Sequence, residues 1–326
     1  MSEEIVVIDD LTVHYETDEG IVEAVNNVSL SIKKGEVLGL VGETGAGKTT
    51  IALSIMNLLP KPPAHVISGE IRLEGSNLFE KDKKALRKIR GSKISMVFQD
   101  PMTALNPVQC VGEQIAEVIR LHNKSLSAAQ VERKAVDMLE TVGIPGERYK
   151  DFPHQFSGGM KQRVVIAIAL ACEPELLIAD EPTTALDVTI QAQVLELMKN
   201  LQKNSGTAML LITHDFGVVA DICNRCAVIY AGEIVELGEL GHIFDHPKHP
   251  YTVGLFKSLP SLDKEVERLE PIPGNVADPT NLPAYCSFYD RCPCRTESCK
   301  LENPKLTEIE PGHFVKCVNI MEAKEG

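Results

Sequence analysis

The feature that most constrains this chain is a glycine-rich segment between an apolar run and a helical pattern. The segment follows the apolar residues 37–41 and reads Gly42, Glu43, Thr44, Gly45, Ala46, Gly47, Lys48, Thr49. Glycines leave backbone N–H groups open to phosphate oxygens, because no Cβ obstructs them. The helix that follows directs the positive end of its dipole at the same place. The spacing therefore predicts a phosphate-binding loop between a strand and a helix.

Charged and hydroxyl side chains complete this predicted nucleotide site. Lys48 supplies a positive charge for the β- and γ-phosphates, and the Thr49 hydroxyl can ligate Mg²⁺. Thr50 is included in the same predicted site. Asp180 and Glu181 follow the apolar run 176–179, and neighbours at a strand end point to opposite sides. We therefore expect Asp180 to serve Mg²⁺ and Glu181 to polarise the attacking water as a general base.

Apolar periodicity predicts an α/β fold with a parallel sheet, because strands and helices alternate along much of the chain. Strands are expected at 5–8, 11–15, 28–32, 37–41, 70–73, 94–98, 176–179, 209–213 and 227–230. Helices are expected at 48–59, over most of 108–170 as an insertion, and at 191–202. After about residue 240, prolines interrupt any long helix, which indicates a separate C-terminal region.

Composition excludes several classes of protein. The 33 basic and 46 acidic residues give a formal charge of −13, which argues against sequence-blind binding to nucleic acid. The longest purely apolar run has nine residues, Val164–Cys172, whereas a membrane-spanning helix needs about 20. The first residues show no basic segment followed by an apolar one, so we expect no secretory signal and a reducing compartment.

Five further motifs give the chain a family resemblance. Around Ser157, Gly158 and Gly159 the sequence resembles the signature motif of the ATP-binding subunits of ABC transporters, with Phe156 and Met160 where Leu and Gln are commoner. Residues 184–187, which end in Asp187, are similar to the D-loop of that family, and Gln99 is similar to its Q-loop glutamine. His214 resembles the switch histidine, and Tyr15 resembles the aromatic residue that stacks on adenine.

The resemblance implies a fold and a mechanism. It implies a P-loop NTPase core of ABC type over residues 1–255, with an N-terminal antiparallel β subdomain and an inserted helical subdomain at about 100–170. Residues 256–326 would form a small Cys/Pro-rich extension. Two such domains pair head to tail, so that ATP lies between the phosphate loop of one and the Ser157 motif of the other. Gln99 would contact Mg²⁺ or water, and His214 would contact the γ-phosphate.

Two segments narrow the resemblance to importers of dipeptides and oligopeptides. These segments are residues 98–107 and 244–252. The implied partners are a paralogous ATP-binding subunit or a second copy of this chain, two integral membrane subunits and an external solute-binding protein, with this chain on the cytoplasmic face of the membrane as a peripheral subunit. Importers of nickel or other small solutes share the subgroup and stay open as an alternative. A soluble ABC-type ATPase acting on nucleic acid or ribosomes is a second alternative.

Cysteines crowd into the end of the chain. Cys286, Cys292, Cys299 and Cys317 are candidate ligands, and Cys294 could replace Cys299. Clustered thiols in a reducing compartment bind metal more often than they form disulfides. Four thiolates suit Zn²⁺ or an iron–sulfur cluster, and free or paired thiols stay open. The resemblance to peptide importers implies a [4Fe–4S] cluster, which would staple the extension.

Overall fold

The computed structural model describes residues 3–184, 186–258 and 271–320. Two compact units are formed, each from several stretches of chain. The first unit comprises Met1–Val6, Ser31–Val37 and Arg72–Thr213. The second unit comprises Val7–Leu30, Leu38–Ile71 and His214–Gly326. Residue 185 of the D-loop, and residues 259–270 and 321–326 of the C-terminal extension, lie outside the described residues.

The first unit contains a parallel sheet and the expected helical insertion. Strands β6 (Ile94–Val97), β7 (Leu176–Asp180) and β8 (Ala208–Thr213) pair in parallel. Every residue of β7 and β8 is buried, which explains why both strands read as continuous apolar runs. The α/β prediction is thereby confirmed for this part of the chain.

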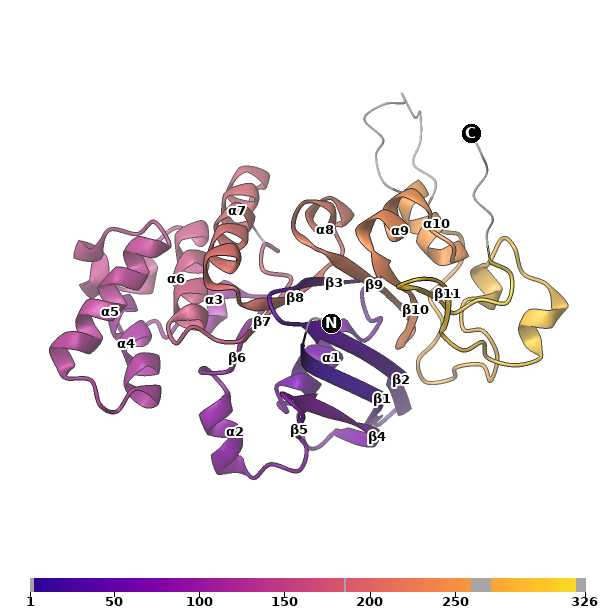
Figure 1. The fold of residues 1–326 in the computed structure, drawn as a ribbon, viewed down its shortest axis with the longest axis horizontal. Helices are drawn as coiled ribbons and strands as arrows, with labels where there is room; N and C mark the ends of the chain where they lie inside the picture. The colour runs from indigo at the N-terminus through magenta and orange to yellow at the C-terminus, as the bar shows by residue number, and fades with distance from the viewer. Residues whose placement is uncertain (1–2, 185, 259–270, 321–326) are drawn as a thin grey trace. The chain divides into compact units, whose positions relative to one another are not determined.

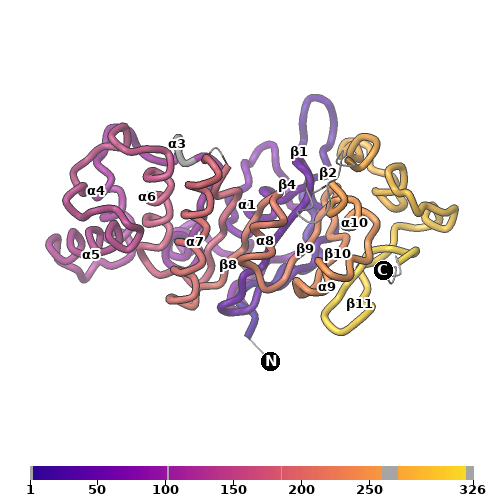
Figure 2. Tube along the Cα trace, turned by 90° about the horizontal axis from the view of Figure 1, so that it is seen from above, coloured from indigo at the N-terminus to yellow at the C-terminus, as the bar shows by residue number. Residues whose placement is uncertain are grey.

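Helices α4, α5 and α6 pack side by side between β6 and β7 in the sequence, as both views of the trace show (Figures 1 and 2). Helix α5 begins at a capping box, in which Ser127 and Gln130 exchange side-chain and backbone hydrogen bonds, a local start signal. The helices of this unit are α2 (Lys83–Ile89), α3 (Pro101–Ala104), α4 (Val111–His122), α5 (Ala128–Thr141), α6 (Gly158–Leu170) and α7 (Val188–Ser205), with 3₁₀ turns at Gly146–Lys150 and Pro153–Gln155.

The N-terminal part of the chain forms a β sheet of its own. Strands β1 (Glu4–Thr17), β2 (Gly20–Lys33) and β4 (Ala64–Leu73) lie in the order β2-β1-β4, and β4 pairs antiparallel with the two-residue strand β5 (Ser76–Asn77). The two strands expected at 5–8 and 11–15 are one strand. Asp10, at a left-handed φ of 46°, marks the irregularity that looked like a break.

Strands of the second unit connect the phosphate loop to the C-terminal extension. Strand β3 (Val37–Val41) pairs in parallel with β9 (Arg225–Tyr230), and β9 pairs antiparallel with β10 (Glu233–Glu239). The extension adds β12 (His313–Val315) to β10 and β11 (Thr307–Glu310) to β12. Strands β10, β11 and β12 were not predicted from the sequence. Neither was the pairing of the extension with the sheet that contains β3.

The helices of the second unit are short. They are α1 (Lys48–Ile55), α8 (Phe216–Ile222), α9 (Leu240–Asp245) and α10 (Pro250–Lys257), with 3₁₀ turns at Tyr289–Arg291 and Glu297–Lys300. Helix α1 ends four residues before the predicted Leu59, because Asn57 adopts a left-handed φ of 49° that stops a helix. Pro250 starts α10 rather than breaking a helix, since the first turn needs no backbone donor there.

Candidate functional site

The predicted phosphate loop connects the fully buried strand β3 to helix α1. A Cβ on Gly42 would lie 2.2 Å from the backbone oxygen of Ile229, and a Cβ on Gly47 would lie 2.3 Å from that of Ala24. Gly47 also has a φ of +99°, which disfavours other residues. These two glycines are therefore required by close backbone packing as well as by access for phosphate.

Three residues of the predicted nucleotide site, Lys48, Tyr15 and Thr50, lie on or beside the helix that follows the loop. The Lys48 amino group is buried and donates to the carbonyl oxygens of Gly42 (2.8 Å) and Glu43 (2.9 Å), so it lies over the loop. The Tyr15 hydroxyl lies 3.3 Å from the Thr50 hydroxyl, which brings these two predicted residues together beside α1. Lys48 is thus held where an anion on the loop can take over its hydrogen bonds.

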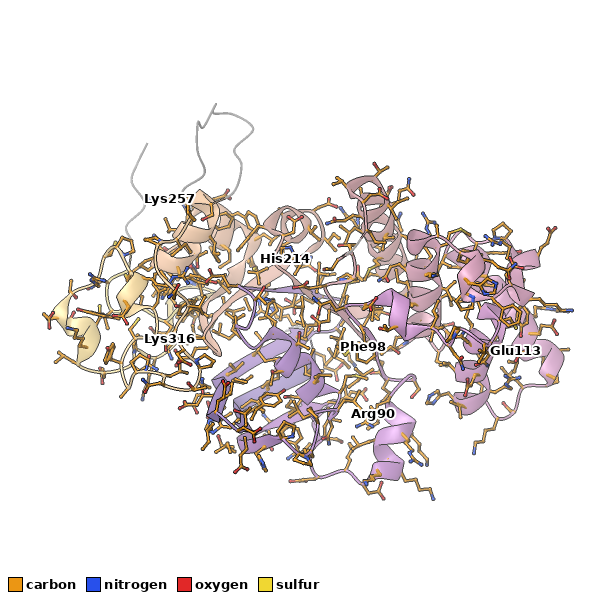
Figure 3. All side chains as sticks on the ribbon, turned by 180° about the vertical axis from the view of Figure 1, so that it is seen from behind. Arg90, Phe98, Glu113, His214, Lys257 and Lys316 are labelled. Carbon is orange, nitrogen blue, oxygen red and sulfur yellow. The ribbon has the colours of Figure 1, made fainter. Side chains whose placement is uncertain are left out.

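His214 follows β8 directly and is exposed at the turn into α8 (Figure 3). The next residue, Asp215, accepts hydrogen bonds from the backbone N–H groups of Gly217 (2.8 Å) and Val218 (3.4 Å). This cap fixes the start of α8 and with it the backbone on which His214 stands.

Glu181 is held by two donors in the first unit. Its Oε2 accepts from Gln99 Nε2 at 3.0 Å and from the Thr184 hydroxyl at 2.9 Å. The backbone of Glu181 has a left-handed φ of 45°, a conformation that costs a side-chain-bearing residue about 1 kcal/mol, and its N–H donates to the carbonyl of Ile212. Asp180, the last residue of β7, is buried. From the sequence, Thr184 was placed only in the D-loop, so its hydrogen bond to Glu181 was missed.

The Ser157 motif forms the start of α6. The Ser157 hydroxyl accepts from the N–H of Met160 (3.4 Å), and a Cβ on Gly159 would lie 2.3 Å from the Cγ2 of Ile190. Gly159 is therefore needed for contact between α6 and α7. Asp187 caps α7 by accepting from the N–H of Ile190 at 3.0 Å, so its side chain has a structural role in addition to the predicted one.

The two departures from the commonest signature have one structural explanation. The Arg148 guanidinium lies over the Phe156 ring, 4.0 Å from its centre, and donates to the sulfur of Met160 at 3.5 Å. Arg148 is itself fixed by the Asp151 carboxylate (2.7 Å) and the Gln155 carbonyl (3.0 Å). Phe156 and Met160 thus form a single packing unit around Arg148 that leaves Ser157 exposed at the helix start.

Two residues of the C-terminal region hold the phosphate loop, and sequence reasoning found neither. The N–H of Glu43 donates to the Tyr251 hydroxyl (3.1 Å), and the Glu43 carboxylate accepts from both terminal nitrogens of Arg291, at 2.7 and 3.1 Å. Tyr251 lies in the segment 244–252 that carries the resemblance to peptide importers, which was a usable signal. Arg291 is 248 residues from Glu43, and no local pattern points to it.

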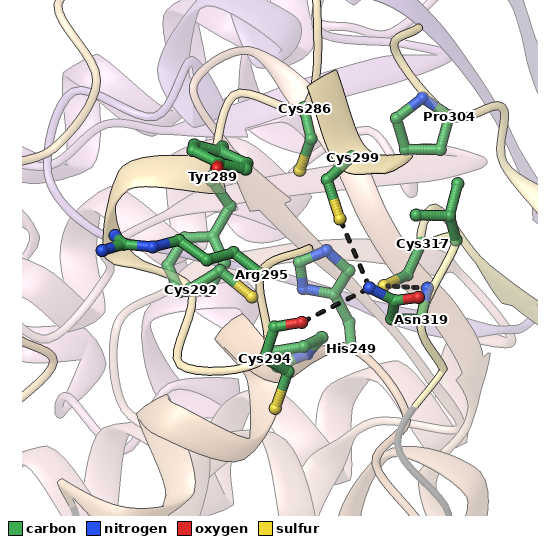
Figure 4. Close-up of a pocket in the computed structure, with 13 residues that line it drawn as sticks. His249, Cys286, Tyr289, Cys292, Cys294, Arg295, Cys299, Pro304, Cys317 and Asn319 are labelled. Atoms are coloured by element: carbon green, nitrogen blue, oxygen red, sulfur yellow. Dashed lines mark hydrogen bonds between the residues drawn. The ribbon is translucent and has the colours of Figure 1, made fainter. Parts of the chain in front are cut away.

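All five cysteines of the extension line one pocket, together with His249 and Asn319 (Figure 4). They are free thiols. Burial raises the pKa of the Cys317 thiol to about 12, and the neighbouring thiols of Cys286, Cys292 and Cys299 act in the same direction. Burial likewise raises the pKa of Cys292 to about 11. These thiols are therefore protonated at neutral pH, and a cation that binds them must displace protons.

The arrangement of the sulfurs distinguishes Cys299 from Cys294. The Asn319 amide donates to the sulfur of Cys299 at 3.4 Å but to the backbone oxygen of Cys294 (Figure 4). The Asn319 N–H donates to the sulfur of Cys317 at 3.3 Å. Among the described residues, no group of three or more Cys, His, Asp or Glu side chains is placed to hold a single metal ion.

Two carboxylates of β10 anchor the extension. Glu236, which is fully buried, accepts from the backbone N–H groups of Lys248 (2.7 Å) and His249 (3.0 Å) and lies 2.8 Å from the Nε2 atom of His313. Glu233 accepts from Lys316 at 2.7 Å (Figure 3), and also from Ser287 and Asn303. The extension is therefore fixed to the same sheet that carries the phosphate loop.

Within the part of the chain that the structure describes, none of the helices combines the length and the apolar character that crossing a bilayer requires.

Comparisons with known proteins agree on one family. The family model described as ABC transporter matches residues 25–184, and the model described as oligopeptide/dipeptide transporter, C-terminal region, matches residues 235–299. A probable peptide ABC transporter ATP-binding protein of Sinorhizobium fredii is 48% identical over 94% of this chain and 92% of its own length. The dipeptide transport ATP-binding protein DppD of Bacillus subtilis is 48% identical over 97% and 94%, respectively.

A solved structure supports the fold assignment. It is a dimeric ATP-binding cassette in a post-hydrolysis state, bound to ADP and Pi, with a TM-score of 0.65 and 30% identity. The match covers 72% of this chain and 98% of that one.

Proposed function

Because this chain belongs to the family of ATP-binding subunits of peptide ABC transporters, we propose that its ATP hydrolysis drives uptake of dipeptides or oligopeptides through partner membrane subunits. The observation that carries the proposal is that relatives named for peptide transport match 94% and 97% of this chain, extension included, at 48% identity. Importers of nickel or another small solute form the alternative, and the assay below separates the two.

The phosphate loop and the carboxylates would divide the work of hydrolysis. Backbone N–H groups of residues 42–49 and the Lys48 amine would bind the β- and γ-phosphates, while Thr49, Gln99 and Asp180 would hold Mg²⁺ directly or through water. Glu181 would polarise the attacking water. The hydrogen bonds from Gln99 and Thr184 to Glu181 support this role, because they orient the carboxylate.

A second cassette would complete each site. The exposed hydroxyl of Ser157 and the helix start at Gly158 are suited to receive the phosphates of a nucleotide on a partner. The partner would be a paralogous subunit or a second copy, and His214 would contact the γ-phosphate. Two membrane subunits and an external solute-binding protein would complete the importer, with this chain on the cytoplasmic face of the membrane.

The test uses the complex solubilised from membranes and reconstituted in liposomes. We expect ATP-dependent uptake of a labelled peptide and none of nickel. Glu181→Gln should keep ATP binding, trap the paired state and lose at least about 100-fold in turnover. Glu196→Gln, an exposed carboxylate on α7, serves as the control and should match the wild type. Nickel uptake without peptide uptake would overturn the substrate assignment, and full turnover in Glu181→Gln would overturn its role.

The cysteine pocket is proposed to hold a [4Fe–4S] cluster through Cys286, Cys292, Cys299 and Cys317. Four thiols around one pocket are the donor set such clusters use, and Zn²⁺, which four thiolates also suit, is the alternative. The pocket that these thiols line has a cavity volume of about 10 Å³. A bound cluster would supply a four-point cross-link to a segment that has little core of its own.

The cluster proposal is tested on protein purified without oxygen. We expect a visible absorption band and about four irons per chain. Cys299→Ser should abolish both, whereas Cys294→Ser should leave both unchanged. A colourless sample that contains zinc would contradict the proposal, and loss of iron only in Cys294→Ser would exchange the two ligands.

A further inference from the structure

Glu43 places a negative charge inside a loop that is built to attract phosphate. The loop recruits phosphate through backbone N–H groups, the dipole of α1 and the Lys48 amine. A carboxylate on the same loop opposes this attraction, because like charges a few ångströms apart repel each other and the wall of a binding site screens them less than bulk water does. The charge of Glu43 must therefore be neutralised for the loop to bind a polyanion well.

Arg291 is placed to neutralise that charge. Its two terminal nitrogens donate to the two carboxylate oxygens of Glu43, at 2.7 and 3.1 Å, in the forked geometry that makes such pairs strong. The side chain of Arg291 is only 5% exposed and that of Glu43 is 30% exposed, so solvent screens the pair less than a surface ion pair.

Other groups besides Glu43 hold the guanidinium of Arg291. It donates to the backbone oxygens of Pro273 (3.2 Å) and Ile272 (3.3 Å) and lies 5.7 Å from the centre of the Tyr230 ring. The Tyr251 hydroxyl meanwhile accepts from the N–H of Glu43. Tyr251 of α10 thus fixes the backbone of Glu43, and Arg291 of the extension fixes its carboxylate.

We propose that Arg291 is a positioning residue for ATP binding, through which the C-terminal extension neutralises Glu43 and holds its carboxylate away from the bound phosphates. This inference rests on ATP binding at the phosphate loop. The extension then has two roles: it contributes to the nucleotide site, and its cysteines hold any metal that binds there.

The experiment is a double-mutant cycle on the full chain, with the Kd for ATP measured by equilibrium binding. Arg291→Gln in the wild-type background should weaken ATP binding about tenfold, equal to about 1.4 kcal/mol, because Glu43 is then uncompensated. In a Glu43→Gln background the same change should weaken binding by less than about twofold. Arg291→Lys, which keeps the charge but loses the fork, should fall between wild type and Arg291→Gln.

Further readouts separate charge from packing. The penalty of Arg291→Gln should shrink as salt is raised, since it is electrostatic. Lys300→Gln removes a positive charge from the same extension, where Lys300 pairs with the exposed Glu297 at 3.5 Å, and should leave the Kd at the wild-type value.

Three results would overturn the inference. A wild-type Kd in Arg291→Gln would do so, and so would an equal loss in both backgrounds, which is the signature of a purely structural residue. If the wild type and the Glu43→Gln variant both fail to bind ATP, the proposed function and this inference fail together. If both bind ATP but the cycle shows no coupling, only the inference fails.

Discussion

Replacing Glu236 by alanine is expected to lower the free energy of unfolding of the second unit by about 4 kcal/mol. The carboxylate is fully buried and bonds to three groups, the N–H groups of Lys248 and His249 and the ring of His313. Each buried donor left without an acceptor costs about 1–3 kcal/mol. Three such donors give about 3–9 kcal/mol, and we take a value near the lower end because water can enter the space left by the side chain.

The assay is urea unfolding followed by circular dichroism, since the chain has no tryptophan. With a denaturant slope of about 3 kcal/mol per molar urea, a loss of about 4 kcal/mol moves the midpoint down by about 1.3 M. Glu310→Ala on β11 is the control, because this carboxylate is exposed, and its expected effect is within about 0.5 kcal/mol.

A smaller change is expected from Glu236→Gln, which keeps one acceptor oxygen and should cost roughly half as much. A Glu236→Ala midpoint within about 0.3 M of the wild type would refute the reasoning, since it would mean that the three hydrogen bonds to β10 contribute little to stability.

Three further outcomes follow from the site. Burial lowers the pKa of the His249 imidazole to about 4, whereas in the unfolded chain it is about 6.5. As the pH falls, the unfolded chain therefore binds this proton first, and the free energy of unfolding should decrease by about 3 kcal/mol between about pH 6.5 and 4. A urea midpoint that stays constant over that range would contradict this expectation. Thr184→Ala should lower kcat for ATP in the assembled complex about fivefold with little change in KM, because a hydrogen bond that orients Glu181, the proposed general base, is lost; a change in KM alone would contradict the proposed role. Gly42→Ala should weaken ATP binding, because the new Cβ meets the backbone oxygen of Ile229 at 2.2 Å; a wild-type Kd would show that crowding there does not disturb the loop.

Motifs whose chemistry is local were predictable. The loop from Gly42 to Thr49 and the pair Asp180–Glu181 need only a buried strand, a turn and a helix start, which neighbouring residues encode. The structure confirms these elements, with β3 at the predicted residues 37–41 and β7 ending at Asp180. The roles of the individual side chains in ATP hydrolysis stay predictions.

Element ends and small strands were predicted less well, for local reasons. Asn57 ends α1 in a left-handed conformation. Asn adopts this conformation more often than most residues, but too rarely for the end of the helix to be predicted from its presence. Strand β10 was missed because its sequence reads as a short run before a proline-rich region, and pairing with β9 and β12 decides its state.

The sequence alone determined which groups can touch a nucleotide, because glycine, lysine and carboxylate motifs carry their chemistry within a few residues. The tertiary structure alone decided which distant residues fix the residues of these motifs in place. Arg291 reaches Glu43 across 248 residues of sequence, and Arg148 explains Phe156 and Met160 together. The physical reason is that charge neutralisation and packing depend on distances in space, which the chain sets only once its sheets have formed.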